Sequence, residues 1–382
     1  MSNEYLIERD NKTIAKSKAL LNQLPGYVKQ FYDAKKGAKK ELTRYAYVQD
    51  IKEFLEYLAP IHHKEVKDFP FKILGELSVQ DIDEYRNILF TSYAPSSVKR
   101  KLASLSSFYK YLVLAGFVKS NPAAVIDWPA EDKEKAIVYL DDEQTAKLLR
   151  GIYANDKQIY YLDNDGETLK STNTRRGSDI KGKAKNKHHD YIIGDIEETT
   201  KKRREKVRMR NYCIVLLFLK TGMRVSELVS LDLDDIDFRN TLIYVTGKGN
   251  KTRPVGFGEE GIVSALKDYI NTCRKALTAK NKGEKALFVS TSGKRISVRQ
   301  IETMIKEMVQ TYLADEENIR KEDFSPHKLR STCATRLLRD TGGNIKGVSA
   351  YLGHDSIEIT SRRYAALNEI ANAKEMEKKS LL

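Results

Sequence analysis

Apolar residues recur at helical spacing along the stretch 41–125, and this pattern constrains the fold of the chain most strongly. The first apolar face ends at Pro60, a residue that interrupts helix interiors. Ser78 stands three residues before Asp81, which is the spacing of a capping box with the shorter acid in place of glutamate. Gly116 follows a third apolar run, as glycine often follows a helix end. The pattern therefore predicts a compact helical unit. Its inward-facing residues include Leu42, Tyr45, Val48, Ile51, Phe54, Leu55, Leu58, Val98, Leu102, Leu105, Phe108 and Leu112.

A second domain is predicted to follow a linker that contains Pro129 and the charged run 131–135. Its patterns are mostly helical. Two short strands, 241–246 and 252–257, are joined by a glycine-containing turn and predict a hairpin. The expected fold class is mainly α with a small β-sheet, in which a helical domain precedes an α+β domain. Helical patterns in the second domain cover 142–149, 208–220, 260–278, 297–313, 326–340 and 344–352.

Between two helices of the second domain lies a polar segment, about 153–206, without strong periodicity. Residues 170–210 contain 14 Lys/Arg and 6 Asp/Glu, a net charge of +8. Long loops of this kind are typically functional or disordered, so we interpret the segment as a basic insertion. The predicted division is an N-terminal extension (1–40), a helical domain (41–129), a second domain (137–382), the insertion (153–206) and a C-terminal tail helix (365–382).

The composition fits a folded, soluble protein. The chain has 382 residues, of which 41% are hydrophobic, enough for two domains with separate cores. No run approaches the roughly 20 apolar residues that cross a bilayer, so no membrane partner is expected. The first residues do not resemble a secretory signal. Cys213, Cys273 and Cys333 are far apart and form neither a disulfide framework nor a CxxC metal site, so a reducing cytoplasm is the expected location.

The formal net charge of +14 favours a polyanionic partner, because basic side chains release counterions from DNA or RNA. An ordinary basic protein would also fit, so the charge alone leaves the partner open. The third predicted helix carries Lys99, Arg100, Lys101 and Lys110 outside its apolar face. The default interpretation is a solvated helix surface. The alternative is a DNA-facing helix, and these four residues are the candidate DNA-binding residues.

Two arginines, two histidines and a tyrosine form the candidate site in the second domain. Arg224 follows a glycine at a predicted helix start, where a side chain can approach a phosphate. His327 and Arg330 share a helical face, His354 lies at a helix-to-loop junction, and Tyr364 follows. Each residue alone is more often a surface charge, a cap or a packed side chain. Together they suit attack on a phosphodiester, because arginine forks bind phosphate oxygens, histidines move protons near neutral pH and a tyrosine hydroxyl can be a covalent nucleophile.

These contexts resemble the tyrosine recombinase (phage integrase) family, whose motifs they match in order. The match covers about 137–382, interrupted by the insertion. The helical unit at 41–125 resembles the family's core-binding domain, and the N-terminal extension resembles that of Xer-type recombinases. The matching motifs are Thr-Gly-Met-Arg-Val-Ser-Glu-Leu (221–228), Gly-Lys-Gly-Asn-Lys-Thr-Arg (247–253), His-Lys-Leu-Arg (327–330) and Leu-Gly-His (352–354) followed by Arg363-Tyr364.

The resemblance implies that Arg224 and Arg330 bind the scissile phosphate and stabilise its pentacoordinate transition state. His327 would assist proton transfer to or from Tyr364, and His354 would donate a hydrogen bond to the phosphate. Tyr364 would attack and leave a 3′-phosphotyrosine and a free 5′ hydroxyl. Because the covalent bond conserves the energy of the phosphodiester, no cofactor, metal ion or ATP is expected. The sequence has no GxxxxGK[ST] loop or acidic metal cluster, which agrees with this.

The resemblance also implies that Lys248 protonates the departing 5′ oxygen, with Lys251 as the alternative. Glu227 fits the acidic position after the first arginine, where it would orient the site. Preorganised cations would then stabilise the charge that builds on the phosphate oxygens.

Two departures from the family pattern affect the assignment. His354 and Tyr364 are ten residues apart, slightly more than in many relatives, which we interpret as a short loop insertion. Ser331 follows Arg330, where many relatives have a second histidine. Tyr351 is the alternative nucleophile, but it lies on a helical run and is expected to be packed.

The leading hypothesis is a site-specific recombinase that acts as a tetramer on paired sites in double-stranded DNA. Dimer resolution and mobile-element integration or excision both stay open, as does an accessory protein. The tail 365–382 has a short apolar stripe that needs a groove, and the resemblance implies docking on the neighbouring protomer rather than on its own domain. The alternatives are a type IB topoisomerase-like relaxing enzyme and a non-catalytic DNA-binding regulator. The separate helical unit and the tail favour the recombinase.

Overall fold

The chain forms two compact units, Met1–Lys135 and Ala136–Leu382, and each unit has its own buried apolar residues. None of the helices described here is long and apolar enough to cross a bilayer. A computed structural model describes residues 4–125, 138–155, 157–162, 168–169, 191–195, 198–247, 251–317, 319, 324–353, 356–358, 360–361 and 364–365.

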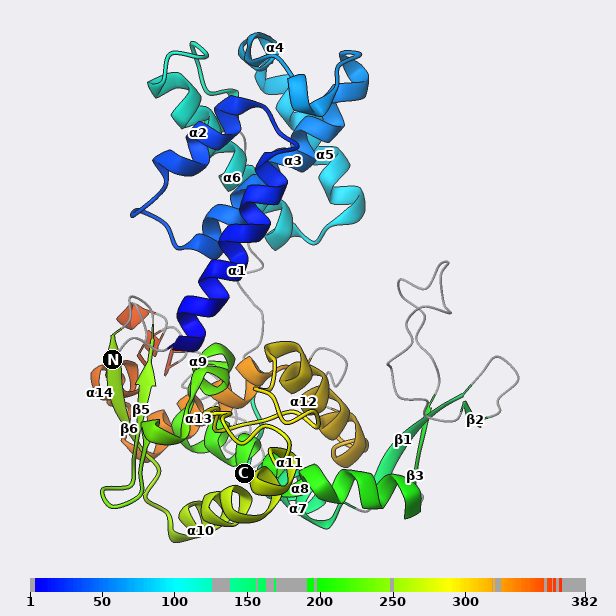
Figure 1. Ribbon diagram of the computed structural model, residues 1–382, viewed down its shortest axis with the longest axis vertical. Helices are drawn as coiled ribbons and strands as arrows, with labels where there is room; N and C mark the ends of the chain where they lie inside the picture. The colour runs from blue at the N-terminus through cyan, green and yellow to red at the C-terminus, as the bar shows by residue number, and fades with distance from the viewer. Residues whose placement is uncertain are drawn as a thin grey trace, which may run out of the picture. The chain divides into compact units, whose positions relative to one another are not determined.

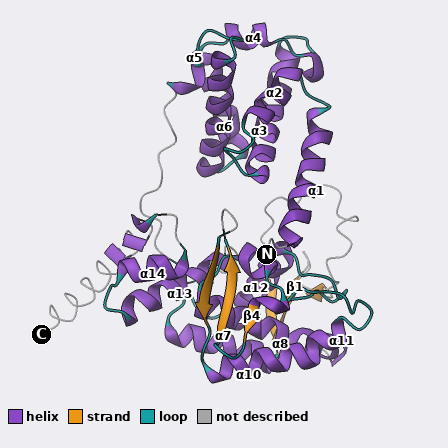
Figure 2. Cartoon of the chain, turned by 60° about the vertical axis from the view of Figure 1, so that its left-hand side comes forward, coloured by secondary structure: helices purple, strands orange, loops and turns teal. Residues whose placement is uncertain are grey.

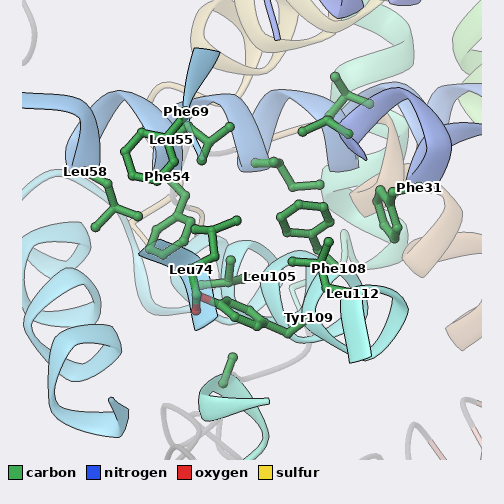
Figure 3. Close-up of a cluster of buried hydrophobic side chains, with 14 of the residues drawn as sticks. Phe31, Phe54, Leu55, Leu58, Phe69, Leu74, Leu105, Phe108, Tyr109 and Leu112 are labelled. Atoms are coloured by element: carbon green, nitrogen blue, oxygen red, sulfur yellow. The ribbon is translucent and has the colours of Figure 1, made fainter. Parts of the chain in front are cut away.

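The first unit is a helical bundle (Figure 1). Its elements are α1 (Glu4–Leu21), α2 (Gly26–Ala34), α3 (Glu41–Ile61), η1 (Val66–Asp68), α4 (Phe71–Glu76), α5 (Val79–Ser92), α6 (Pro95–Leu114) and η2 (Pro122–Ala124). Aromatic side chains fill its centre (Figure 3). Phe31, Phe54 and Phe108 are nearly fully buried, and the rings of Phe31 and Phe108 meet edge to face with centroids 5.2 Å apart. Burial stabilises the bundle by roughly 1.5–3 kcal/mol for each such side chain.

The helix signals in the sequence of this unit are confirmed, although Leu42, predicted to face inward, is exposed. The Ser78 hydroxyl accepts a hydrogen bond from the Asp81 N–H at 3.3 Å, and the Asp81 carboxylate accepts one from the Ser78 N–H at 2.6 Å. Pro60 lies in the last turn of α3. Gly116 follows α6 with φ of +74°, a left-handed conformation that glycine adopts without strain.

The region predicted as an N-terminal extension contains two helices, α1 and α2. Leu21, Leu24, Tyr27 and Phe31 are buried in the same cluster as the apolar residues of α3, α5 and α6. Pro25 is the N-cap of α2. Pro25 therefore separates two helices that both pack on the bundle.

The second unit is built around α8, against which α7, α10 and α13 pack. The helices predicted between residues 142 and 352 are present, although a π-helical turn, η5, interrupts the one that begins at Glu260. The elements are α7 (Asp142–Ala154), β1 (Lys157–Leu162), β2 (Thr168–Leu169), β3 (Tyr191–Asp195), α8 (Glu198–Thr221), α9 (Val225–Ser230), η3 (Leu233–Asp235), β4 (Ile236–Asp237), β5 (Leu242–Thr246), β6 (Thr252–Gly256), α10 (Glu260–Tyr269), η5 (Ile270–Arg274), α11 (Lys275–Leu277), α12 (Val298–Tyr312), α13 (Pro326–Asp340) and α14 (Ile345–Leu352).

A small antiparallel sheet with the order β4-β5-β6 contains the predicted hairpin (Figure 2). Thr246 pairs with Thr252 beside the turn, and Leu242 pairs with Gly256 at the other end. Helix α9 contacts β5. The prediction of a mainly helical fold with a small sheet is confirmed.

The segment predicted as an insertion, 153–206, contains regular structure that its polar sequence does not indicate. Helix α7 continues to Ala154 and α8 begins at Glu198. Between them lies a second antiparallel sheet with the order β2-β1-β3, on the opposite side of this unit from β5 and β6 (Figure 1). Strand pairing relies on backbone hydrogen bonds, so a strand can form without the apolar alternation that a sequence pattern detects. The basic run 170–190 lies outside the described residues.

We predict that Gly151→Ala destabilises the second unit. Gly151 lies within α7, where a Cβ would be 2.3 Å from Cδ1 of Tyr312 at the end of α12. Alanine favours a helix by up to about 1 kcal/mol, but the forced displacement of the ring should cost about 1–3 kcal/mol. Urea denaturation should therefore show a lower midpoint. Gly261→Ala in α10 is the control, because nothing lies within 4 Å of its Cβ position. Equal midpoints for the two variants would contradict the packing described.

Candidate active site

Glu227 lies at the centre of a cluster of arginines. Arg224 is the N-cap of α9, and Glu227 is the third residue of that helix. The Glu227 side chain is only 4% exposed. Its Oε2 accepts a hydrogen bond from the Arg224 backbone N–H at 2.8 Å, and its Oε1 accepts one from Nη1 of Arg224 at 2.9 Å. The helix start therefore fixes the arginine through both its backbone and its side chain.

Arg253 binds the same carboxylate from β6. Its Nη1 donates to Oε1 of Glu227 at 3.2 Å, and its Nη2 donates to Oε2 at 3.1 Å. This two-point geometry suits the planar guanidinium. A Cβ at Gly247 would lie 3.5 Å from Oε1 of Glu227, so the hairpin turn begins beside the carboxylate. The hairpin and α9 are thus held together at one buried acidic group.

The carboxyl end of α14 receives all three arginines. Leu352 O accepts from Nη2 of Arg330 at 3.0 Å and from Nη2 of Arg253 at 3.2 Å, and Gly353 O accepts from Nη2 of Arg224 at 2.7 Å. The last carbonyls of a helix have no partners within it and carry the negative end of its dipole. They therefore attract guanidinium groups.

Two glycines make this convergence sterically feasible. Gly222 has φ of +57° and Gly353 has φ of +66°, both in the left-handed region that glycine favours. A Cβ at Gly222 would be 2.5 Å from Cδ2 of Leu352, and one at Gly353 would be 3.0 Å from Cζ of Arg253. Gly222 O also accepts a hydrogen bond from Nη1 of Arg330 at 2.6 Å. The glycines allow the backbone of the loops to approach the arginines closely.

The electrostatics of the cluster favour an anion. Burial alone raises the pKa of Glu227, but hydrogen bonds from Arg253 and Arg224 outweigh it and hold the pKa below its ordinary value. Burial, together with the positive charge of Arg224 and Arg253, lowers the pKa of Arg330 to about 10, so its guanidinium stays charged at neutral pH. Among the described residues of the cluster, two guanidinium groups pair with the one carboxylate, and the third, that of Arg330, donates to Leu352 O beside them.

Tyr364 does not lie with the arginines. It is partly buried against the apolar cluster of α13 and α14. A Cβ at Gly343 would lie 2.5 Å from the Tyr364 hydroxyl oxygen. The Gly343 N–H donates to Leu338 O at 2.8 Å, and eight residues separate Leu338 from Arg330, which is about 12 Å along a helix. The structure therefore places the hydroxyl at the end of α13 that is remote from Arg330.

The other predicted site residues are only partly located. His327 is exposed in the first turn of α13. Lys248 and His354 lie outside the described residues, although Gly247 and Gly353 adjoin the cluster. No three His, Cys, Asp or Glu side chains are grouped for a metal ion in the residues that the structure describes.

Lys251 and Tyr351, the alternatives to Lys248 and Tyr364, lie in different environments. Lys251 is exposed at the end of the hairpin turn. Tyr351 is packed, as expected: its hydroxyl donates to Gly256 O at 3.2 Å, and burial raises its pKa to about 12.

The four candidate DNA-binding residues lie on α6 in different environments. Lys110 is exposed and Lys99 is partly exposed. Arg100 forms an ion pair with Asp50 and keeps half of its side chain exposed. Lys101 is buried, where its ammonium binds the carboxylate of Glu53 and lies 3.5 Å from an oxygen of Asp50. Lys101 therefore takes part in the internal structure of the bundle.

Arg253 is the site residue that the sequence reasoning did not single out. It is the last residue of the Gly-Lys-Gly-Asn-Lys-Thr-Arg motif. The alternation of side chains along the predicted strand could have indicated its role. Side chains alternate along a strand, so Arg253 shares a face with Val255, which is fully buried. An arginine on an inward face requires an acidic or carbonyl partner, although the sequence does not say which one.

We predict that Glu227→Gln lowers the free energy of unfolding by about 1.5–3 kcal/mol at pH 7, because charge-assisted hydrogen bonds between a buried carboxylate and two partly buried arginines are lost. The pKa of Glu227 is lower in the folded protein. Its ionised form therefore stabilises the fold above the unfolded pKa of about 4.3, and this stabilisation is lost as the pH falls through the folded value. Urea denaturation of both proteins should show a difference that shrinks below that pH.

Glu259→Gln is the control for this measurement, because it removes an exposed carboxylate that pairs with Lys220. Its effect should stay below about 1 kcal/mol. A Glu227→Gln effect that is equally small, or the same at every pH, would contradict the central role of the carboxylate.

Both units resemble parts of known proteins. The model of the phage integrase family matches residues 193–370, and that of the phage integrase N-terminal SAM-like domain matches residues 28–116. The tyrosine recombinase XerC of Bifidobacterium longum subsp. infantis is 30% identical over 311 residues, which cover 78% of this chain and 84% of that protein.

Two solved structures share the fold. One is the Tn1549 transposon integrase in complex with circular intermediate DNA, with a TM-score of 0.57 and 19% identity over 88% of this chain and 94% of that one. The other is the XerH site-specific recombinase bound to its difH substrate, with a TM-score of 0.54 and 18% identity over 87% of this chain and 78% of that one. Together with the arginine cluster and the family models, the extent of the XerC match shows that the chain belongs to the tyrosine recombinase (phage integrase) family.

Proposed function

We propose that this protein is a site-specific recombinase that cleaves and rejoins double-stranded DNA through a 3′-phosphotyrosine intermediate. The observation that carries the proposal is the convergence of Arg224, Arg253 and Arg330 on one carboxylate and one helix end. A phosphodiester gains negative charge in its pentacoordinate transition state. Cations that are already in place stabilise that charge without reorganisation.

Arg224 and Arg330 are the proposed phosphate-binding arginines. The Arg224 side chain is 37% exposed, and its guanidinium is held by Glu227 and Gly353 O. Arg330 is buried, and its guanidinium donates to Gly222 O and Leu352 O. We assign proton transfer to His327, a hydrogen bond to the phosphate to His354, and protonation of the departing 5′ oxygen to Lys248, as the family motifs imply.

Tyr364 is the proposed nucleophile, and it must move before it can attack. Its hydroxyl lies beside Gly343 at the far end of α13, whereas attack requires contact with the phosphate that Arg330 binds. We propose that assembly on DNA brings the segment after Gly353 to the arginine cluster. In this proposal the tail 366–382, which lies outside the described residues, docks on a neighbouring protomer and couples the two events.

The proposed partner is duplex DNA, bound by a tetramer on paired sites in the cytoplasm. XerH and the Tn1549 integrase are bound to DNA in their solved structures. On α6, Lys99, Arg100 and Lys110 are the residues that we propose to face the phosphates. Light scattering of the complex with paired sites tests the assembly, because a tetramer should give the mass of four protein chains and two duplexes. A relaxing enzyme would instead give the mass of a complex on a single site.

The experiment that tests the function traps covalent protein–DNA adducts from sheared genomic DNA of the source organism and sequences the attached DNA. Tyr364→Phe should abolish the adducts, because phenylalanine lacks the nucleophilic oxygen. Tyr351→Phe is the matched control and should form adducts as the wild type does, since its hydroxyl only contacts backbone carbonyls. Adducts that persist in Tyr364→Phe, or that the wild type never forms, would refute the proposal.

We also predict that Arg224→Lys slows cleavage of the captured site by about 10²–10³-fold, because lysine keeps the charge but loses the fork that contacts two oxygens. Duplex affinity should change little, since many other phosphate contacts support it. Single-turnover cleavage and a gel-shift titration measure the two quantities. Arg336→Lys is the control, because Arg336 is similarly exposed at 41% and pairs with Asp142 on the surface of the same unit. Similar rates for both variants would exclude Arg224 from the phosphate site.

A further inference from the structure

We propose that Arg253 is a positioning residue of this site, which holds the hairpin, α9 and α14 in the arrangement that catalysis requires. The inference rests on the proposed function, because the site that Arg253 supports is the proposed phosphate site. It assigns a role to a residue outside the set of Arg224, Arg330, the histidines and Tyr364.

The contacts of Arg253 join three separate elements. From β6 it binds both oxygens of Glu227 on α9, and it also donates to two carbonyls at the end of α14, Leu352 O at 3.2 Å and Tyr351 O at 3.4 Å. Each of its three guanidinium nitrogens therefore donates to a protein acceptor. Its side chain is only 20% exposed. These contacts allow Arg253 to orient the protein groups on all three elements.

The positions of three catalytic motifs depend on these contacts. Glu227 fixes the Arg224 guanidinium, and Leu352 O is shared between Arg253 and Arg330. The hairpin that carries Arg253 also carries the turn in which Lys248 lies. One planar side chain thus sets the distances between the two phosphate-binding arginines and the hairpin. A lysine could supply the charge, but it could not make the parallel pair of hydrogen bonds.

The absence of a side chain at Gly353 leaves room for the Arg253 guanidinium. The guanidinium lies so close that a Cβ at Gly353 would be 3.0 Å from Cζ and 3.1 Å from Nε of Arg253. The left-handed glycine at the end of α14 therefore serves the approach of Arg253 as well as the end of the helix.

The alternative is that Arg253 only stabilises the fold. Arg295 provides a matched comparison, because it also joins a helix end to a carboxylate. It donates to Val229 O at 2.8 Å and to Leu231 O at 3.1 Å at the end of α9, and it pairs with Asp232. None of these groups belongs to the arginine cluster. Arg295→Gln therefore removes a similar structural contact without touching the proposed site.

The experiment measures single-turnover formation of the covalent adduct on the captured duplex, from pH 5 to pH 9, for wild type, Arg253→Gln, Arg253→Lys and Arg295→Gln. Arg253→Gln should slow the reaction about a hundredfold, as expected for displaced catalytic groups, with unchanged duplex affinity. The acidic limb of the pH–rate profile of Arg253→Gln should also move to higher pH. Glu227 faces Arg224, Arg253 and Arg330, so without Arg253 the buried carboxylate protonates more readily. Arg253→Lys should return the acidic limb of the pH–rate profile to its wild-type position but should recover only part of the wild-type rate.

A further pair of variants tests whether Arg253 acts through Glu227. In a Glu227→Gln background, Arg253→Gln should add little further loss, because the groups that it connects are already released. If Arg253→Gln matches Arg295→Gln in rate and pH profile, or if the two losses in the double variant multiply, the positioning role is wrong. If the wild type itself forms no adduct, the proposed function is wrong, and the positioning role that rests on it is then wrong as well.

Discussion

The site depends on the carboxyl end of a single short helix. Helix α14 ends at Leu352, and its last carbonyls accept hydrogen bonds from Arg224, Arg253 and Arg330. Three guanidinium groups would repel one another if they were brought together in water. The helix dipole and the buried carboxylate of Glu227 offset that repulsion. The residual positive charge is then held in place before any substrate arrives.

This arrangement requires particular residues at the supporting positions, Glu227, Gly222 and Gly353, as well as the arginines themselves. Glu227 accepts four hydrogen bonds, two from Arg224 and two from Arg253, so neither of its oxygens lacks a partner. A buried charge with partial pairing would be costly. Gly222 and Gly353 contribute by the absence of a Cβ, since each lies where a side chain would meet Leu352 or Arg253. The precision of the cluster comes from this close approach of backbone.

Under the proposed function, the location of Tyr364 would separate the binding of a phosphate from its cleavage. The arginines are assembled, whereas the hydroxyl lies against Gly343, beside the apolar cluster of α13 and α14. If the nucleophile moves only on a complete DNA assembly, an isolated protein does not cut DNA at random. The same separation makes the segment after Gly353 the part of the chain whose rearrangement decides when the proposed reaction starts.

Local patterns predicted much of this molecule. The spacing of apolar residues predicted most of the helices, the Ser78–Asp81 cap and the hairpin, because those features depend on near neighbours in the chain. The motif order indicated Arg224, Arg330 and Tyr364 as a set. The strands within 153–206 and the packing of α1 and α2 on the bundle were not predicted, since backbone pairing and partners distant in sequence decide them.

The identity of each reactive group follows from the sequence, whereas the contacts between these groups depend on how the elements pack. Glu227 and Arg253 stand on different elements, and no spacing rule links them. Their contact, and the sharing of Leu352 O with Arg330, arises only when β6, α9 and α14 pack together. Likewise, the motifs identified Tyr364 but not its position beside Gly343. A side chain's identity is local, whereas its distance from a group far away in the chain follows from the packing of the whole unit.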